Sequence, residues 1–378
     1  MFRVRLLIYC VGRCRELHLE PVDDNRWVST MRQVLRAFLL LVCIAPLPWA
    51  ETRAAEDKPF VIGFSQATTT EPWRLLFNKE LRAEAAKYPE IELIVRDGQD
   101  DARNQIADVE EFIEQRVDII LISPKVAGAL TPVVNRAFDM GIPIIVLDRD
   151  LANKRYTQFI GGDNKLIGRT AGKYAVSRLG GAGKASGNIV EIWGGMKSTP
   201  AQDRHEGFAE AIREEPGIRS LPVAEDGDWK QDLAYEIMAD TLERFDKIDL
   251  VYAHNDPMAY GAYLAAKDAG REKAIMFLGI NGIPAEGVRW VHEGVLTATF
   301  LYMTPGAEGI RQAIKLLRGE EIQPRVTLPT MTIDRSNAEQ ILLYHGLINR
   351  KEKDRTEKHS KPVDERASIL ASRSGDIR

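Results

Sequence analysis

The sequence predicts an α/β protein made of two similar lobes, each a doubly wound parallel sheet. From residue 60 onward, short segments rich in Ile, Val and Leu alternate with longer amphipathic segments, and this alternation restarts after residue 162. Alternating strands and helices give parallel sheets with right-handed crossovers. The segment 142–147, IPIIVL, is apolar throughout, which is typical of a strand covered by helices on both faces.

The pattern indicates the elements of each unit. In the first unit we expect strands at 60–65, 91–96, 118–122, 142–147 and 156–160, with helices at 73–87, 105–115 and 128–140. In the second we expect strands at 188–193, 221–224, 249–253, 274–280 and 296–301, with helices at 166–179, 200–215, 231–245, 257–269, 285–292 and 305–318. A last extended piece at 326–333 contains Pro329, which favours the edge of a sheet.

The first 55 residues have the character of a targeting segment. Met31 opens a basic stretch, 37–45 is an apolar run, and small residues suited to cleavage lie at 50–55, which together predict a cleaved secretory signal peptide. We expect translation to start at Met31, so that residues 1–30 are a spurious extension. The expected location is the periplasm, and the charged stretch 346–378 is expected to be a disordered tail.

All three cysteines precede the expected cleavage site, so the mature chain needs no disulfide and offers no thiol chemistry. They are Cys10, Cys14 and Cys43.

Composition and motifs exclude several function classes. A formal charge of −4 in 378 residues gives no basic footprint for nucleic acid. The first strand is not followed by the glycines of a dinucleotide site, and 180–184 lacks the residues of a P-loop. Histidines at metal-ligand spacing and a G-x-S-x-G elbow are missing from the sequence. We therefore expect no cofactor, no metal and no enzymatic activity.

Polar and aromatic residues follow the predicted strands at their carboxyl ends, where open α/β sheets bind ligands. In the first unit these residues are Glu71, Trp73, Arg74, Asp97, Gln99, Asp148 and Arg149. In the second unit they are Asp203, Arg204, Asp228, Trp229, Asn255, Asp256 and Asn281. Planar carboxylate, amide and guanidinium groups bond neighbouring hydroxyls, and an indole face covers the C–H face of a sugar ring. The set as a whole indicates a sugar site.

Each of these residues, taken alone, also has a purely structural explanation. Asp203 suits a charge at a helix terminus, Trp73 and Trp229 suit the core, and Asn255 suits a helix cap. Asp148 and Arg149 suit a salt bridge that fixes a loop. The repetition at seven strand ends is what favours a common site.

Several segments resemble the type I periplasmic binding proteins, the sugar-binding receptors of bacterial ABC transporters. They are GFSQ…EPWR, LDRD, GGDNKLIGRTAG, AQDRHEGFAEAI, YAHNDPMAYGA and GINGIP, and the resemblance runs from Lys58 to Asp334. It is closest to the galactofuranose and ribose branch, with DGQ at 97–99 among the features of the galactofuranose receptors.

The resemblance implies a role for each position. Trp73 and Trp229 would enclose the sugar ring, with Glu71 and Arg74 at the rim. The hydroxyl ligands would be Asp148, Arg149, Arg204 and Asn255. Two positions depart from the ribose pattern, Asn281 in place of Asp and Tyr302 in place of Gln, so ribose is not the expected ligand.

The resemblance also implies two lobes joined by three crossings, near Gly162, Tyr302 and Val326. The first lobe would comprise 58–162 and 303–325, and the second 163–302 and 326–345. Closure of the hinge would bury the ligand between them.

The sequence-based interpretation is a monomeric receptor that passes a monosaccharide to an ABC permease in the inner membrane. The alternative is a sugar sensor that reports to a chemoreceptor or sensor kinase. A LacI-type regulator has the same lobes but would need an N-terminal helix-turn-helix, where this chain has its signal segment. An enzyme would need a base in the cleft, for which Asp148 is the only plausible residue.

Overall fold

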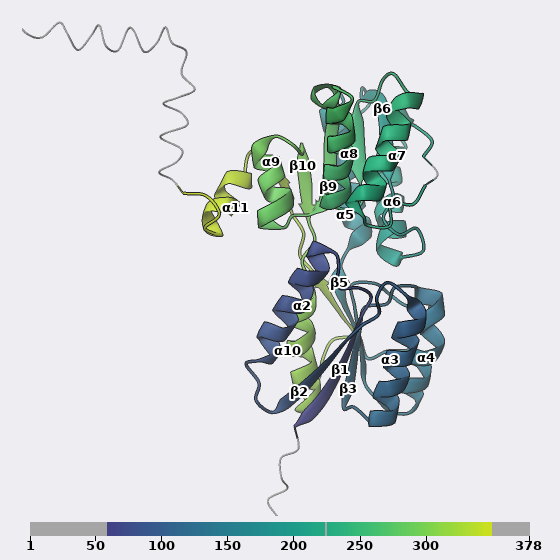
Figure 1. Ribbon diagram of the computed structural model, residues 1–378, viewed down its shortest axis with the longest axis vertical. Coiled ribbons are helices and arrows are strands. Elements are labelled where there is room, and N and C mark those ends of the chain that lie inside the picture. The colour runs from purple at the N-terminus through teal and green to yellow at the C-terminus, as the bar shows by residue number, and fades with distance from the viewer. Residues whose placement is uncertain (1–58, 224, 350–378) are drawn as a thin grey trace, which may run out of the picture. The chain divides into compact units, whose positions relative to one another are not determined.

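The computed structural model describes residues 59–223 and 225–349, which form two α/β lobes (Figure 1). The expected fold class, two parallel-sheet lobes, is confirmed. The expected signal peptide, the three cysteines and all but the first residues of the expected tail lie outside the described residues. Within the described part of the chain, no helix is both long and apolar enough to cross a bilayer.

The first lobe contains a six-stranded, fully parallel sheet in the order β11-β5-β4-β3-β1-β2. Its strands are β1 (Phe60–Gln66), β2 (Ile91–Asp97), β3 (Ile119–Ile122), β4 (Ile144–Leu147), β5 (Gln158–Gly162) and β11 (Arg325–Leu328). Its helices are α2 (Pro72–Ala85), α3 (Ala102–Gln115), α4 (Ala127–Asp139) and α10 (Gly306–Leu317). Helices α2 and α10 cover one face of the sheet and α3 and α4 the other (Figure 1).

The second lobe repeats this plan in the order β12-β10-β9-β8-β6-β7, with β12 antiparallel to β10. Its strands are β6 (Ser186–Ile192), β7 (Gly217–Ser220), β8 (Leu250–Ala253), β9 (Met276–Asn281), β10 (Ala298–Leu301) and β12 (Thr332–Asp334). Its helices are α5 (Asn164–Arg178), α6 (Thr199–Ile212), α7 (Gln231–Arg244), α8 (Asp256–Asp268), the 3₁₀ turn η1 (Glu272–Ala274), the π-helical turn η2 (Pro284–Val288), α9 (Arg289–Glu293) and α11 (Ala338–Tyr344).

The two sheets share one strand order around their first strands. In the first lobe β1 lies between β2 and β3, and in the second β6 lies between β7 and β8. The strand order therefore reverses next to β1 and next to β6, and open α/β sheets bind ligands in the crevice at such a point.

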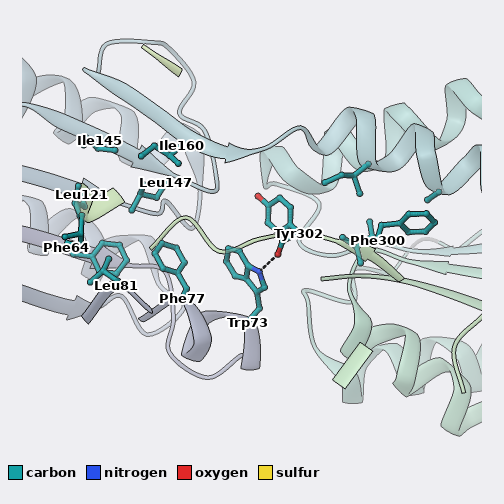
Figure 2. Packing of buried hydrophobic residues seen from close by; sticks show 14 of the residues in the cluster. Phe64, Trp73, Phe77, Leu81, Leu121, Ile145, Leu147, Ile160, Phe300 and Tyr302 are labelled. Atoms are coloured by element: carbon teal, nitrogen blue, oxygen red, sulfur yellow. Dashed lines mark hydrogen bonds between the residues drawn. The ribbon is translucent and has the colours of Figure 1, made fainter. Parts of the chain in front are cut away.

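One hydrophobic cluster extends through both lobes (Figure 2). In the first lobe it contains Phe64 and Phe77, and in the second Phe300. Trp73 and Tyr302 connect these parts, because their rings stack at 5.3 Å between centroids and the indole N–H donates to the Tyr302 carbonyl at 2.9 Å. The core of one lobe is thus continuous with that of the other at the hinge.

The chain crosses between the sheets after β5, after β10 and after β11. Val326 belongs to β11, which pairs with β5 of the first sheet as far as Leu328, so the proposed boundary at 326 is wrong. Pro329 has no N–H with which to continue the ladder. The expected single extended piece is therefore two edge strands, β11 and β12, in different sheets.

Two other expected elements are also corrected. The strand expected at 221–224 lies earlier, at Gly217–Ser220, because Leu221 makes one last ladder bond to Ile189 and Pro222 has no N–H to donate. The helix expected at 285–292 begins as the π-helical turn η2 and becomes α-helical only at Arg289.

A buried carboxyl holds the second lobe together. Asp256, in the first turn of α8, is fully buried and accepts hydrogen bonds from the Gly282 N–H at 2.8 Å and the Thr299 hydroxyl at 2.6 Å. Gly279 and Gly287 make room for it, since a Cβ there would lie 2.3 Å and 1.9 Å from its oxygens. Burial raises the pKa of Asp256 to about 7.

We expect Asp256 to make the folded state less stable as the pH rises from about 4 to about 7. The unfolded chain ionises this carboxyl near its ordinary value, whereas the folded state keeps it protonated up to about pH 7. The loss should be a few kcal/mol, since each pKa unit corresponds to about 1.4 kcal/mol. Urea unfolding of wild type and Asp256→Asn between pH 4 and 8 measures it, with Asp139→Asn, an exposed aspartate, as control. An equally steep pH dependence in Asp256→Asn would contradict this assignment.

Candidate functional site

Residues from both lobes line a pocket of about 310 Å³, its open mouth included. The first lobe contributes Glu71, Trp73, Arg74, Asp148 and Arg149. The second contributes Pro200, Arg204, Trp229, Asn255 and Asn281, and Tyr302 joins them from the second crossing. Of the residues that the sequence predicted for the site, the lining lacks Asp97, Gln99, Asp203, Asp228 and Asp256 and includes all the others. The volume of the pocket is at the lower limit for small-molecule sites, which is about 300 Å³.

Proline in the first turn fixes the start of three helices that border the pocket. Pro72 begins α2 after β1, Pro200 lies in the first turn of α6 after β6, and Pro257 lies in that of α8 after β8. Proline suits this position because the first N–H groups of a helix have no partner within the helix. The first turns of these helices, or the turn that follows, hold Arg74, Arg204 and Asn255 at the pocket.

The backbone is strained around the pocket. Among the described residues seven non-glycine residues have positive φ, and one of them, Arg116, ends a helix. The other six lie in the loops after β2, β4 and β7 and at the end of β9: Gln99, Asp100, Asp148, Asp228, Trp229 and Asn281. Such conformations persist only where the surroundings hold them, and they concentrate at ligand sites.

Asp148 is fully committed to hydrogen bonds within the protein. One oxygen accepts from the Tyr302 hydroxyl at 2.7 Å, and the other accepts from Arg74 at 2.9 Å and Ser123 at 3.3 Å. Burial raises the pKa of Asp148, but the cations of Arg74 and Arg149 and these hydrogen bonds outweigh burial and lower the pKa below the usual carboxyl value. Asp148 is therefore an anion that organises the site, and it is unsuited to act as a base.

Two arginines face the pocket from opposite lobes. Arg149 makes one long bond of 3.4 Å to the Lys125 carbonyl, and Arg204 donates to Asn164 at 2.9 Å and to the His254 carbonyl. Their guanidinium carbons lie 5.6 Å and 5.3 Å from the Trp229 ring centroid, within range of cation–π attraction.

Trp229 lies closely against backbone. A Cβ on Gly194 or Gly195 would come within 2.4 Å of its ring, so only glycine fits at these two positions. Its indole N–H is buried and has no hydrogen-bond partner in the described part of the chain. The ring therefore contributes an aromatic surface to the pocket, and its N–H takes no part in fixing the fold.

The two asparagines of the pocket differ in what they leave for a ligand. Asn255 caps α8, accepting from the Met258 N–H and donating to the Trp229 carbonyl, both at 2.9 Å, so the cap expected from the sequence is present. The Asn281 side chain makes no hydrogen bond to any described residue, and it lines the pocket. Its amide is free to donate and to accept.

Asp97 and Asp203 lie outside the pocket lining, each for a different reason. Asp97 accepts from the Thr69 hydroxyl and the Gln99 N–H, and so closes a loop after the edge strand β2. Asp203 precedes Arg204 on α6, where consecutive residues point about 100° apart. Sequence reasoning missed Pro200, which lines the pocket, and Asn164, which joins Arg204 to Tyr302. The proline of a first helical turn was the available signal for Pro200.

Four charged residues join the lobes beside the pocket, and we refer to them as the interlobe ion cluster: Asp100, Lys125, Asp228 and Lys230. Lys125 of the first lobe lies 3.0 Å from Asp228 of the second, and Lys230 of the second lies 3.3 Å from Asp100 of the first. Asp228 and Lys230 flank Trp229 in the chain. The contact between the lobes is therefore directly linked to the pocket wall.

A second, wider hollow of about 1310 Å³ shares Trp73, Asn281 and Tyr302 with the pocket. Its lining includes Met303 and Met331 but no arginine, lysine or aspartate. Glu80 is the one carboxylate in its lining, which lacks the arginines that converge in the smaller pocket. Among the described residues no group of His, Cys, Asp and Glu is arranged to hold a metal ion.

Comparison with known proteins identifies the family. Residues 62–321 match the model of the periplasmic binding protein domain. The galactofuranose-binding protein YtfQ of Escherichia coli is 35% identical over 252 residues, covering 65% of this chain and 78% of that protein.

Two solved structures show the same fold. The fructose-binding periplasmic domain of a hybrid two-component system has a TM-score of 0.73 and 39% identity, covering 78% of this chain and 97% of that one. A galactofuranose-binding protein has a TM-score of 0.69 and 31% identity, covering 75% and 98%. The chain therefore belongs to the periplasmic binding proteins, with the two lobes of the type I fold.

Proposed function

We propose that this protein is the substrate-binding protein of a carbohydrate ABC importer. In this proposal it is not an enzyme. In the periplasm the protein captures a monosaccharide between its lobes, and the sugar has a ring of galactofuranose size. The protein then delivers this sugar to a permease in the inner membrane. The observation that carries the proposal is the single pocket in which strand-end residues of both lobes converge.

The pocket has the chemistry that a sugar needs. Arg149, Arg204 and Asn281 offer donors that the protein leaves unused, and Trp73 and Trp229 offer aromatic surface. Hydroxyl groups accept hydrogen bonds from guanidinium and amide donors, while the C–H face of a sugar ring packs on an indole. Residues from two lobes also allow the ligand to be enclosed when the lobes close on it.

The similarity to YtfQ supports a furanose as ligand, and Asn281 and Tyr302 argue against ribose. The asparagine removes a negative charge that the ribose pattern has, and the tyrosine hydroxyl is already bound to Asp148. A hydroxyl that donates to Asp148 is not available to donate to a sugar.

A second candidate is a periplasmic sugar sensor, and one observation favours it. The fructose-binding domain, 39% identical to this chain, is part of a hybrid two-component system. Deleting the gene distinguishes the two functions. Uptake of labelled sugar falls if the protein serves a permease, whereas sugar-dependent gene expression falls if the protein serves a kinase.

We expect Arg149→Met to weaken sugar binding by about 100-fold, since a hydrogen bond to a charged group contributes about 1.5–3 kcal/mol. The stability of the ligand-free protein should change little, because Arg149 makes one long hydrogen bond to the protein. Calorimetric titration and thermal unfolding measure the two effects. The matched control is Arg136→Met, whose guanidinium is exposed on α4.

Wild-type affinity in Arg149→Met would show that the pocket is not the sugar site. Arg204 is less suited to this test, because it also bonds Asn164 and His254 and lies 4.5 Å from the Tyr302 ring centroid. Its replacement should lower the stability of the second lobe as well as the affinity.

We expect Lys230→Met to release sugar two- to fivefold faster, because it removes one ion pair that joins the lobes, and exposed pairs contribute about 0.2–1 kcal/mol. Stopped-flow tryptophan fluorescence gives the dissociation rate, and added salt should reduce the difference from wild type. Glu110→Gln is the control, since its ion pair with Arg136 lies within one lobe. Equal rates in all three proteins would mean that the interlobe ion cluster does not hold the ligand.

A further inference from the structure

Two buried arginines of the pocket, Arg149 and Arg204, have no carboxylate within hydrogen-bond distance, and we propose that the ligand supplies one. The substrate class is then a sugar acid, a uronate or an aldonate, whose carboxylate binds Arg149 and Arg204. This inference rests on the proposed function, because it names the class of sugar that the same pocket takes.

The charges that line the pocket do not balance. They are three arginines, Arg74, Arg149 and Arg204, and two carboxylates, Glu71 and Asp148. Arg74 lies closest to both carboxylates, 2.9 Å from Asp148 and 3.7 Å from Glu71. Three arginines against two carboxylates leave one net positive charge on the lining.

Arg149 has most of its donors free. A guanidinium has five N–H donors, and here a single contact of 3.4 Å to the Lys125 carbonyl is made. The nearest carboxylate oxygen, on Asp148, lies 3.8 Å away, which is beyond hydrogen-bond distance. Arg149 is only 3% exposed and lines the pocket.

Arg204 is held in place by neutral groups only. It donates to the Asn164 side chain and to the His254 carbonyl, and its guanidinium lies between the rings of Trp229 and Tyr302. It is 2% exposed. These contacts fix the direction of the guanidinium plane and leave its second terminal nitrogen without a protein partner.

The second lobe adds no anion to the pocket. Its other lining residues, Pro200, Trp229, Asn255 and Asn281, and the hinge residue Tyr302 are uncharged. The nearby carboxyl of Asp256 is bound on both oxygens by Gly282 and Thr299. The lysines and aspartates of the interlobe ion cluster pair with one another. No described carboxylate thus lies within hydrogen-bond distance of Arg149 or Arg204.

A carboxylate on the ligand completes this arrangement. An ion pair in a buried site is favourable only when hydrogen bonds satisfy both partners, and arginine binds a carboxylate with two parallel bonds. Both guanidinium carbons lie within 6 Å of the Trp229 ring centroid, and both arginines line the same pocket. The hydroxyls of the same ligand would then meet Asn281, which is free to donate and accept.

The test compares sugars that differ in one carboxylate. The mature protein is unfolded in urea and refolded to remove any ligand carried through purification. It is then titrated calorimetrically with D-galacturonate, its methyl ester and D-galactose, and with D-gluconate and D-glucitol. We expect at least one acid to bind tenfold or more tightly than its neutral counterparts.

The variant Arg149→Gln removes the charge but keeps a hydrogen-bond donor. It should lose at least tenfold in affinity for the acid and less for the neutral sugars, while Arg136→Gln should match wild type. A preference for acids that persists in Arg149→Gln would overturn the assignment of the carboxylate to Arg149.

The outcomes separate this inference from the proposed function. If neutral hexoses or furanoses such as galactofuranose and fructose bind and the acids do not, the protein is a sugar receptor and the sugar-acid inference is wrong. If neither acids nor neutral sugars bind the refolded protein, the proposed function fails and the inference fails with it.

Discussion

The site depends on Tyr302, the residue at which the chain crosses back from the second lobe to the first. Its hydroxyl donates to Asp148, its carbonyl accepts from the Trp73 indole, and its ring stacks on that indole and lies below Arg204. One residue therefore contacts the start of α2, the end of β4 and the second turn of α6. Figure 2 shows the contact between Tyr302 and Trp73 at this junction.

The junction divides the polar residues into two groups with different tasks. Arg74, Asp148 and the Tyr302 hydroxyl satisfy one another, and Asp148 stays ionised because two arginines outweigh the effect of burial on its pKa. Arg149 makes one long hydrogen bond to the protein, and the Asn281 side chain makes none to any described residue. The first group fixes the geometry of the pocket, and the second group gives the pocket its affinity for a ligand. The strained backbone at Asp148 and Asn281 fits this division, since rigid surroundings are needed to keep such conformations.

The sequence predicted the fold well because apolar periodicity and strand-end chemistry are local signals. The prediction of the lobe boundary was wrong where tertiary contacts determine strand pairing. Val326 pairs with β5 and so belongs to the first sheet. Asp97 and Asp203 have the residue type and the strand-end position of site residues. Asp97 is bound by Thr69, from the loop after β1, and by Gln99, and the contact with Thr69 is not visible in the sequence. Asp203 precedes Arg204 on α6 and so points in another direction, which follows from the predicted helix. Asn255 shows that a cap and a pocket residue need not be alternatives, because it is both. The pairing of Asp148 with Tyr302, 154 residues apart, could not be read from either segment alone.

The most direct test of the account is a crystal structure of the protein with the sugar that binds it most tightly. The account predicts a single sugar between the lobes, with oxygens within hydrogen-bond distance of Arg149, Arg204 and Asn281 and its ring against Trp73 or Trp229. A sugar seated in the wider apolar hollow, or held by one lobe without these residues, would contradict it.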